Sequence, residues 1–188
     1  HQQGALLYIY QSDRIREIEF VDVSLSDNFD FSKMTLAEKI IVGGENYKQY
    51  NIGYNPLTQY NLSKLPFLRV LDIRNTPAKK VDASGCPRLE QLLAGGTQLE
   101  ELDVAQTSPI STLQLPGTIT RLDLVNLPML TFPGGLTIES MTRVNRLMLS
   151  GCPHVDPMSL INGIINSSSI QYIRLPDVNI TAPSSILT

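Results

Sequence analysis

The stretch LEELDVAQT, at residues 99–107, has apolar residues at its first, fourth and sixth positions and a small polar residue at its ninth. The same pattern is found in LRVLDIRNT at 68–76, and with an apolar or cysteine ninth position in ITRLDLVNL at 119–127 and VNRLMLSGC at 144–152. Apolar residues two positions apart point to one face of an extended strand, and the residues between them point to the other face. Each copy therefore predicts a short strand with one buried face.

The pattern recurs at a nearly constant interval as far as Ile119, and then twice more after longer intervals. The starts are Ile15, Ser26, Ala37, Tyr47, Leu57, Leu68, Ala78, Leu89, Leu99, Ile110, Ile119, Val144 and Ile170. Two successive starts together span one coil of a leucine-rich repeat, about 21 residues. Because one short strand cannot bury its apolar face alone, this spacing predicts stacked coils that share one core.

Every second start is expected to contribute a strand to the main parallel sheet. Counting back from the last three starts predicts strands centred on residues 18–20, 40–42, 60–62, 81–83, 102–104, 122–124, 147–149 and 173–175. The intervening starts predict extended segments on the opposite wall. The core is predicted to include Leu71, Ile73, Leu92, Leu102, Val104, Leu122, Leu124, Leu147 and Leu149.

The two longer C-terminal coils contain extra residues, at 138–143 and 158–166. The second insertion follows Asp156-Pro157, a pair in which Asp can cap a helix and Pro is favoured at the first helical position. Its apolar residues have helical spacing. We therefore expect a short helix on the convex side.

The motif L-x-x-L-x-L-x-x-[N/C/T] resembles the leucine-rich-repeat superfamily from about Ile15 to Val178. This resemblance implies a β-dominated solenoid of the α/β type and a single leucine-rich-repeat domain over residues 1–188. In that family the ninth position usually carries Asn or Cys, which bonds the backbone of the turn. Here this position carries mainly Thr or Cys, at Thr76, Cys86, Thr97, Thr107, Thr118 and Cys152.

A narrower resemblance concerns LPGTITRL at 115–122 and LSGCPHVD at 149–156. These stretches are similar to leucine-rich segments of structural, tail-associated proteins of gut-bacterial phages and prophages. Such segments are embedded in longer virion polypeptides, which implies that this chain is a fragment with flanking domains. The alternative origin is a secreted or surface protein of a gut bacterium.

Composition argues against several functions. A net charge of −3 and a pI near 5.3 do not favour nucleic-acid binding, and no apolar run approaches the roughly 20 residues of a membrane helix. His1 and His154 are the only histidines, and no nucleophile–base–acid set is evident. Cys86 and Cys152 are predicted to lie three coils apart, roughly 15 Å by strand spacing, so they are expected to be unpaired. The sequence predicts no enzyme, cofactor or metal site.

The candidate binding residues are Asp82, Asp103 and Asp123, flanked by Arg121 and Arg146. The three aspartates occupy the same outward position of successive predicted strands, so they are expected to form a column with a spacing of about 4.8 Å. The simpler interpretation is a solvated polar face, on which Lys79, Lys80 and the two arginines reduce the repulsion between the carboxylates. A straight column does not supply metal ligands from several directions. We expect partner contact on this face because only there does the solenoid present a repeated array of outward side chains on a stiff backbone. The opposite wall, with Arg69, Asp72 and Arg74, ranks second.

These observations predict a non-catalytic binding or scaffold module of a phage or prophage structural protein, located in the virion, outside the cell or on its surface. Its partners are expected to be a protein or a cell-surface glycan, with no nucleic acid and no membrane insertion. Two alternatives stay open. One is a ligand-binding leucine-rich-repeat domain of a secreted or cell-surface bacterial protein, and the other is a structural spacer between flanking domains.

Overall fold

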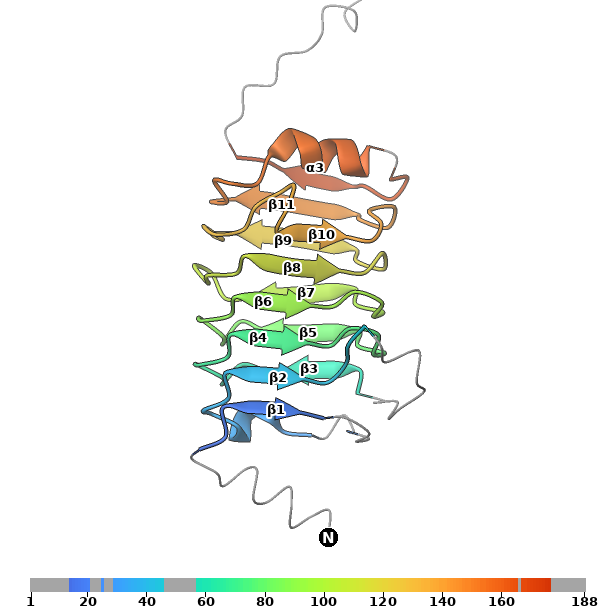
Figure 1. The fold of residues 1–188 in the computed structure, drawn as a ribbon. Helices are drawn as coiled ribbons and strands as arrows, with labels where there is room; N and C mark the ends of the chain where they lie inside the picture. Colours follow the sequence, from blue (N-terminus) through green and yellow to red (C-terminus); the bar gives the residue numbers. More distant parts are fainter. Residues whose placement is uncertain (1–13, 21–24, 26–28, 46–56, 166, 177–188) are drawn as a thin grey trace, which may run out of the picture.

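A computed structural model describes residues 14–20, 25, 29–45, 57–165 and 167–176. The chain winds into a stack of flat coils, with one wall of strands in front and another behind (Figure 1). All strand pairs are parallel. The predicted β-dominated solenoid is thus confirmed, and Leu71, Leu92 and Leu113 lie in register in three successive coils.

One wall, which we call the continuous wall, is a single sheet with six strands among the described residues. The strands lie in this sheet in the same order as in the sequence, because each successive coil contributes one strand next to that of the coil before it. The strands are β1 (Glu17–Glu19), β2 (Lys39–Ile41), β4 (Val70–Asp72), β6 (Gln91–Leu93), β8 (Thr112–Leu115) and β10 (Leu136–Ile138).

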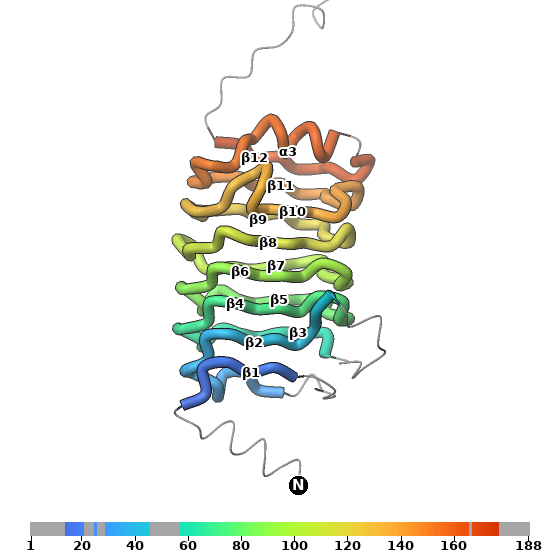
Figure 2. Tube along the Cα trace, in the orientation of Figure 1, coloured from blue at the N-terminus to red at the C-terminus, as the bar shows by residue number. Residues whose placement is uncertain are grey.

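The other wall, which we call the divided wall, consists of two sheets, each with three described strands. The first contains β3 (Gln59–Asn61), β5 (Lys80–Ala83) and β7 (Glu101–Val104), and the second contains β9 (Arg121–Val125), β11 (Arg146–Ser150) and β12 (Tyr172–Arg174). The tube trace crosses from one wall to the other and back in each coil (Figure 2).

A short helix replaces a strand at each end of the stack. At the N-terminal end, the 3-10 helix η1 (Phe31–Lys33) lies against β3, where the Phe31 and Tyr60 rings stack with centroids 5.7 Å apart. At the C-terminal end, α3 (Pro157–Ile164) lies on the side of the continuous wall (Figure 1). As predicted, Asp156 caps α3 by accepting from the N–H groups of Met158 and Ser159, and Pro157 begins it.

The two walls enclose one continuous apolar core. Most of the predicted core residues are confirmed as buried: Leu71, Ile73, Leu92, Leu122, Leu124, Leu147 and Leu149. The prediction is wrong for Leu102 and Val104 in β7, which pack against the core but are only half-buried.

The predicted assignment of strands to walls is wrong for the first two strands. Ile18 pairs with Ile40, and Ile40 pairs with Leu71 on the continuous wall. Counting every second start predicts instead that Ile18 and Ile40 lie on the same wall as Tyr60. The predicted half-coil that begins at Tyr47 falls within 46–56 and lies outside the described residues. Because both walls bury their apolar faces in the same core, a slip of half a coil leaves the hydrophobic pattern unchanged.

The divided wall is interrupted between β7 and β9 by one extra residue. In the β5 coil the turn closes with the Cys86 N–H donating to the carbonyl of Ala83, while in the β7 coil Ser108 donates to Ala105, one position later in the repeat. The Thr107 N–H still donates to the backbone carbonyl of Asn126 at 2.7 Å, and the Thr120 N–H donates to the backbone carbonyl of Glu100 at 3.2 Å. The two strands are therefore joined at their ends but do not pair in register between them.

Candidate binding surface

The outward side chains of the divided wall form two columns that run along the stack. The strand registers align the first column as Gln59, Lys80 and Glu101, then Arg121, Arg146 and Tyr172 beyond the interruption. They align the second as Asn61, Asp82 and Asp103, then Asp123, Met148 and Arg174. All five residues predicted from the sequence therefore lie on this wall.

Asp82 and Asp103 are neighbours in register, but their environments differ. The Asp82 carboxylate accepts hydrogen bonds from the backbone N–H and hydroxyl of Ser84, at 3.0 and 2.6 Å. Asp103 is exposed and makes no hydrogen bond or ion pair with any described residue. Of these two carboxylates, Asp103 is the one that is available to a partner.

Asp123 is held between the two predicted arginines. The Arg146 Nε donates to its Oδ1 at 2.9 Å, and an Arg121 terminal nitrogen donates to its Oδ2 at 3.0 Å. The Asp123 side chain is 23% exposed. The structure thus brings Asp123, Arg121 and Arg146 together. Asp123 is not paired in register with Asp103, because β7 and β9 belong to different sheets.

Two further residues of this surface were missed in the sequence. The Arg146 guanidinium lies over the ring of Tyr172, 4.8 Å from its centroid, an attractive cation–π arrangement. Arg174, in register with Met148, is exposed. Both occupy the same outward positions as the aspartates and arginines, counted from the start at Ile170, so the repeat pattern could have identified them.

Charge is segregated along the divided wall. Outward side chains of β5 and β7 comprise Lys80 with Asp82, Glu101 and Asp103, a net charge of −2. Those of β9, β11 and β12 comprise Asp123 with Arg121, Arg146 and Arg174, a net charge of +2. The sign changes where the ladder is interrupted, so the wall has an acidic half and a basic half.

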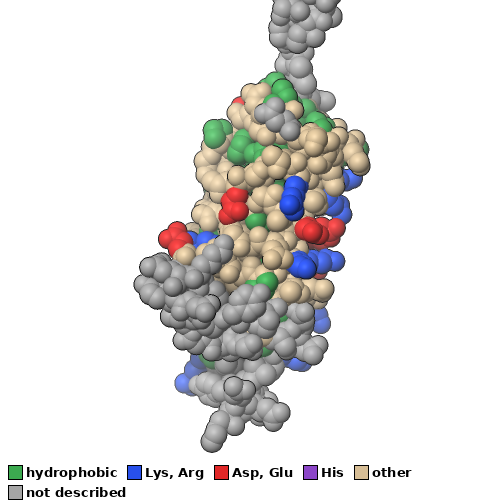
Figure 3. All heavy atoms as spheres, turned by 90° about the vertical axis from the view of Figure 1, so that its right-hand side faces the viewer, with side chains coloured by type: hydrophobic (Ala, Val, Ile, Leu, Met, Phe, Trp, Pro, Cys, Tyr) green, Lys and Arg blue, Asp and Glu red, His purple; other side chains and the backbone are tan. Residues whose placement is uncertain are grey.

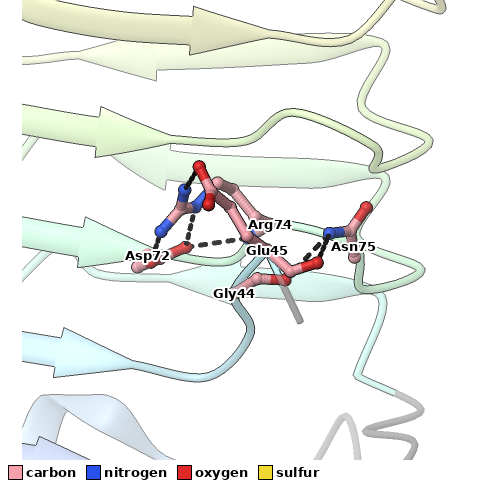
Figure 4. A network of polar contacts seen from close by, with 5 residues as sticks. All are labelled: Gly44, Glu45, Asp72, Arg74 and Asn75. Carbon is pink, nitrogen blue, oxygen red and sulfur yellow. Dashed lines mark hydrogen bonds and ion pairs between the residues drawn. The ribbon is translucent and has the colours of Figure 1, made fainter. Parts of the chain in front are cut away.

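On the continuous wall, Asp72 and Arg74 are engaged with each other. Asp72 is buried, and Arg74 binds both of its carboxylate oxygens, with Nε–Oδ1 at 3.0 Å and Nη2–Oδ2 at 2.7 Å (Figure 4). Arg74 also pairs with Glu45, and Asn75 donates to the carbonyl of Gly44 at 2.8 Å. This network ties two successive coils together and leaves Asp72 little contact with solvent.

The side of the stack seen in Figure 3 is mainly uncharged. Where described residues are visible there, polar side chains and backbone dominate, with a few scattered charges (Figure 3). The described part of this side therefore offers no charge array comparable to the divided wall.

The cysteines are unpaired and buried. The Cys86 thiol donates to the carbonyl of Leu62 at 3.1 Å, and burial, with a smaller contribution from Asp82, raises its pKa to about 12. Burial also raises the pKa of Cys152, whose thiol bonds to the carbonyls of Leu124 and Ser150. A thiol that stays protonated at neutral pH is a poor nucleophile.

Two kinds of feature are absent from the described part of the chain. Within it, no three His, Cys, Asp or Glu residues are grouped so as to hold a metal ion. It also contains no helix with the length and hydrophobicity needed to span a bilayer.

Fold and surface together define a parallel β-solenoid with leucine-rich coils and a charge-segregated strand face. Comparison of the sequence with models of protein families gives no match, and comparison with curated proteins gives none either.

Proposed function

We propose that this chain is a non-catalytic binding or scaffold module that contacts a protein or a cell-surface glycan through its divided wall. The observation that carries the proposal is the segregation of outward charge into an acidic and a basic half. The resemblance of 115–122 and 149–156 to phage and prophage leucine-rich segments supports a place in a structural protein of the virion or of the cell surface.

The rigidity of the wall supports a binding role. Its outward side chains stand on paired strands, so little backbone entropy is lost when a partner binds. Segregated charge orients an approaching partner and raises the rate of encounter more than the affinity. Asp103 and Arg174 represent the two halves, because each is exposed and neither is used in an ion pair within the described chain.

The test is binding of the labelled chain to intact gut-bacterial cells and to an array of bacterial surface glycans. We expect Asp103→Asn and Arg174→Gln, separately, to reduce binding at least about tenfold without a change in melting temperature. The matched control is Glu17→Gln, which removes an exposed charge from the continuous wall.

Salt dependence provides a second readout. Binding that uses these charges should weaken between low and physiological ionic strength, because salt screens exposed charges. Equal binding by all three variants would reject the divided wall as the contact surface, and no binding by any form would favour the spacer function.

A further inference from the structure

Among the described residues, the C-terminal end of the stack is uncovered. β12 pairs with β11 on one side, and among the described residues no strand pairs with its other edge. Its middle residue, Ile173, is in register with Leu147 and Leu122, which are 0% and 2% exposed, yet Ile173 itself is 45% exposed. A core position is therefore half-exposed because no described strand lies beyond it.

The same end carries further apolar surface. α3 and β12 both lie at this end of the stack (Figure 2). Met158 and Ile165 are among the most exposed large apolar residues of the described chain, at 43% and 69%. Tyr172 is 42% exposed. Terminal coils of solenoids require a polar cap to stay soluble, and the described residues of this end do not present one.

The secondary-structure elements at the two ends of the stack restrict what can cover the exposed apolar residues of the C-terminal end. On the continuous wall, the first described element is the strand β1 and the last is the helix α3. On the divided wall, the first described element is the helix η1 and the last is the strand β12. Copies stacked head to tail would place a helix against a strand on both walls. Copies stacked tail to tail would place β12 against β12 and α3 against α3.

We propose that a second copy of this chain covers this end, related by a two-fold axis that passes through both walls near Ile173. The two β12 strands then pair antiparallel, with Ile173 opposite Ile173 of the second copy, and the two cores become one. Such an isologous contact closes on itself and yields a dimer.

The neighbours of Ile173 fit this pairing. On the outward face, Tyr172 of one copy lies opposite Arg174 of the other, so each ring receives a second guanidinium in addition to Arg146. Both copies bring basic side chains to the joint. Moderate salt should therefore strengthen the dimer by screening their repulsion, opposite to the expectation for partner binding by the divided wall.

Sedimentation velocity of the whole 188-residue chain tests the proposal. We expect a concentration-dependent change from 20.8 kDa to about twice that mass. Ile173→Lys should raise the dissociation constant at least about tenfold. Met129→Lys, at an apolar residue that is 56% exposed in the turn after β9, should leave it unchanged.

Cross-linking provides a readout that does not depend on the stability of the lysine variant. Residues directly opposite in an antiparallel pair have Cβ atoms about 4.5–5.5 Å apart, close enough for a disulfide after small adjustments. Ile173→Cys should therefore form a covalent dimer on mild oxidation, whereas Met129→Cys should not. A chain that stays monomeric and uncross-linked at about 100 μM, well above a micromolar dissociation constant, would overturn the proposal. Open-ended polymers would overturn it in favour of head-to-tail stacking.

Discussion

At the scale of single residues, the turns that follow several strands require a left-handed backbone. Asn75, Gly96, Asn126 and Gly151 adopt positive φ at equivalent positions, with values of 61°, 70°, 53° and 65°. Asn and Gly tolerate this conformation. In the β7 coil the extra residue places Thr107 there, with φ of 63°. A β-branched residue is strained in this region.

Relief of that strain is the first prediction at this scale. Thr107→Asn should stabilise the fold by about 1 kcal/mol, because a β-branched residue is strained at positive φ by about that amount and Asn tolerates this conformation. Urea unfolding measures the difference. The reverse change, Gly96→Thr, should destabilise the protein. A loss of stability in the asparagine variant would show that Thr107 is not strained.

Burial of Cys86 predicts a dependence of stability on alkaline pH. Its pKa is about 12 when folded against 9.0 for the ordinary thiol. The folded state therefore favours the protonated form, and this contribution is complete below pH 9 and is lost as the pH rises toward 12. Relative to Cys86→Ala, the wild type should lose up to about 1.4 kcal/mol per pH unit in that window. Parallel stability curves for the two proteins would contradict the assignment.

The ion pairs of the continuous wall should differ in their effect on stability. Arg74→Met leaves the buried Asp72 carboxylate without its partner and should cost about 3 kcal/mol. Arg69→Met removes the exposed pair with Glu90 and should cost much less. Thermal unfolding of both variants tests this order, and similar losses would mean that Asp72 is solvated.

At the scale of the strands, burial is set by pairing rather than by pattern. Leu102 and Leu122 occupy the same motif position, but Leu122 is 2% exposed while Leu102 is half-buried at the interrupted step. Leu122 lies in a strand with a full register of partners in β11. Leu102 lies in a strand that pairs only with β5 among the described strands.

This difference predicts unequal costs of truncation. Leu122→Ala should lose about 2–5 kcal/mol, and Leu102→Ala about 1–2 kcal/mol, because less apolar surface returns to water at the half-buried site. Guanidinium unfolding of both variants provides the comparison. Equal losses would indicate that β7 packs as tightly as β9.

At the scale of the whole molecule, one wall is a continuous sheet and the other is two sheets. The divided wall is interrupted between β7 and β9, whereas at the same level of the stack β6 and β8 pair directly on the continuous wall. Backbone groups without a ladder partner exchange their protons more readily. We expect faster hydrogen exchange for amides at the β7–β9 step than for amides at the β6–β8 step. Equal protection on both walls would show that the ladder is closed in solution.

The sequence by itself determined the repeat, the coil length and the helix at Asp156-Pro157, because these depend on local spacing and on capping chemistry. It also determined which side chains of β5 to β11 point outward, since alternation along a strand is local, and this placed Asp82, Asp103, Asp123, Arg121 and Arg146 on one wall. That they form a binding site is still a proposal.

Only the tertiary structure decided the wall to which β1 and β2 belong, the break between β7 and β9, and the clamp of Asp123 by two arginines. Both walls bury their apolar faces in one core, so hydrophobic periodicity cannot distinguish them. The break arises because the turn after β7 closes one residue later in the repeat than the turn after β5. The spacing of the starts does not reveal this, since the steps from Ala78 to Leu89 and from Leu99 to Ile110 are both 11 residues. Side-chain contacts such as that between Arg146 and Tyr172 join residues of successive coils, and they form only once the coils are stacked in register.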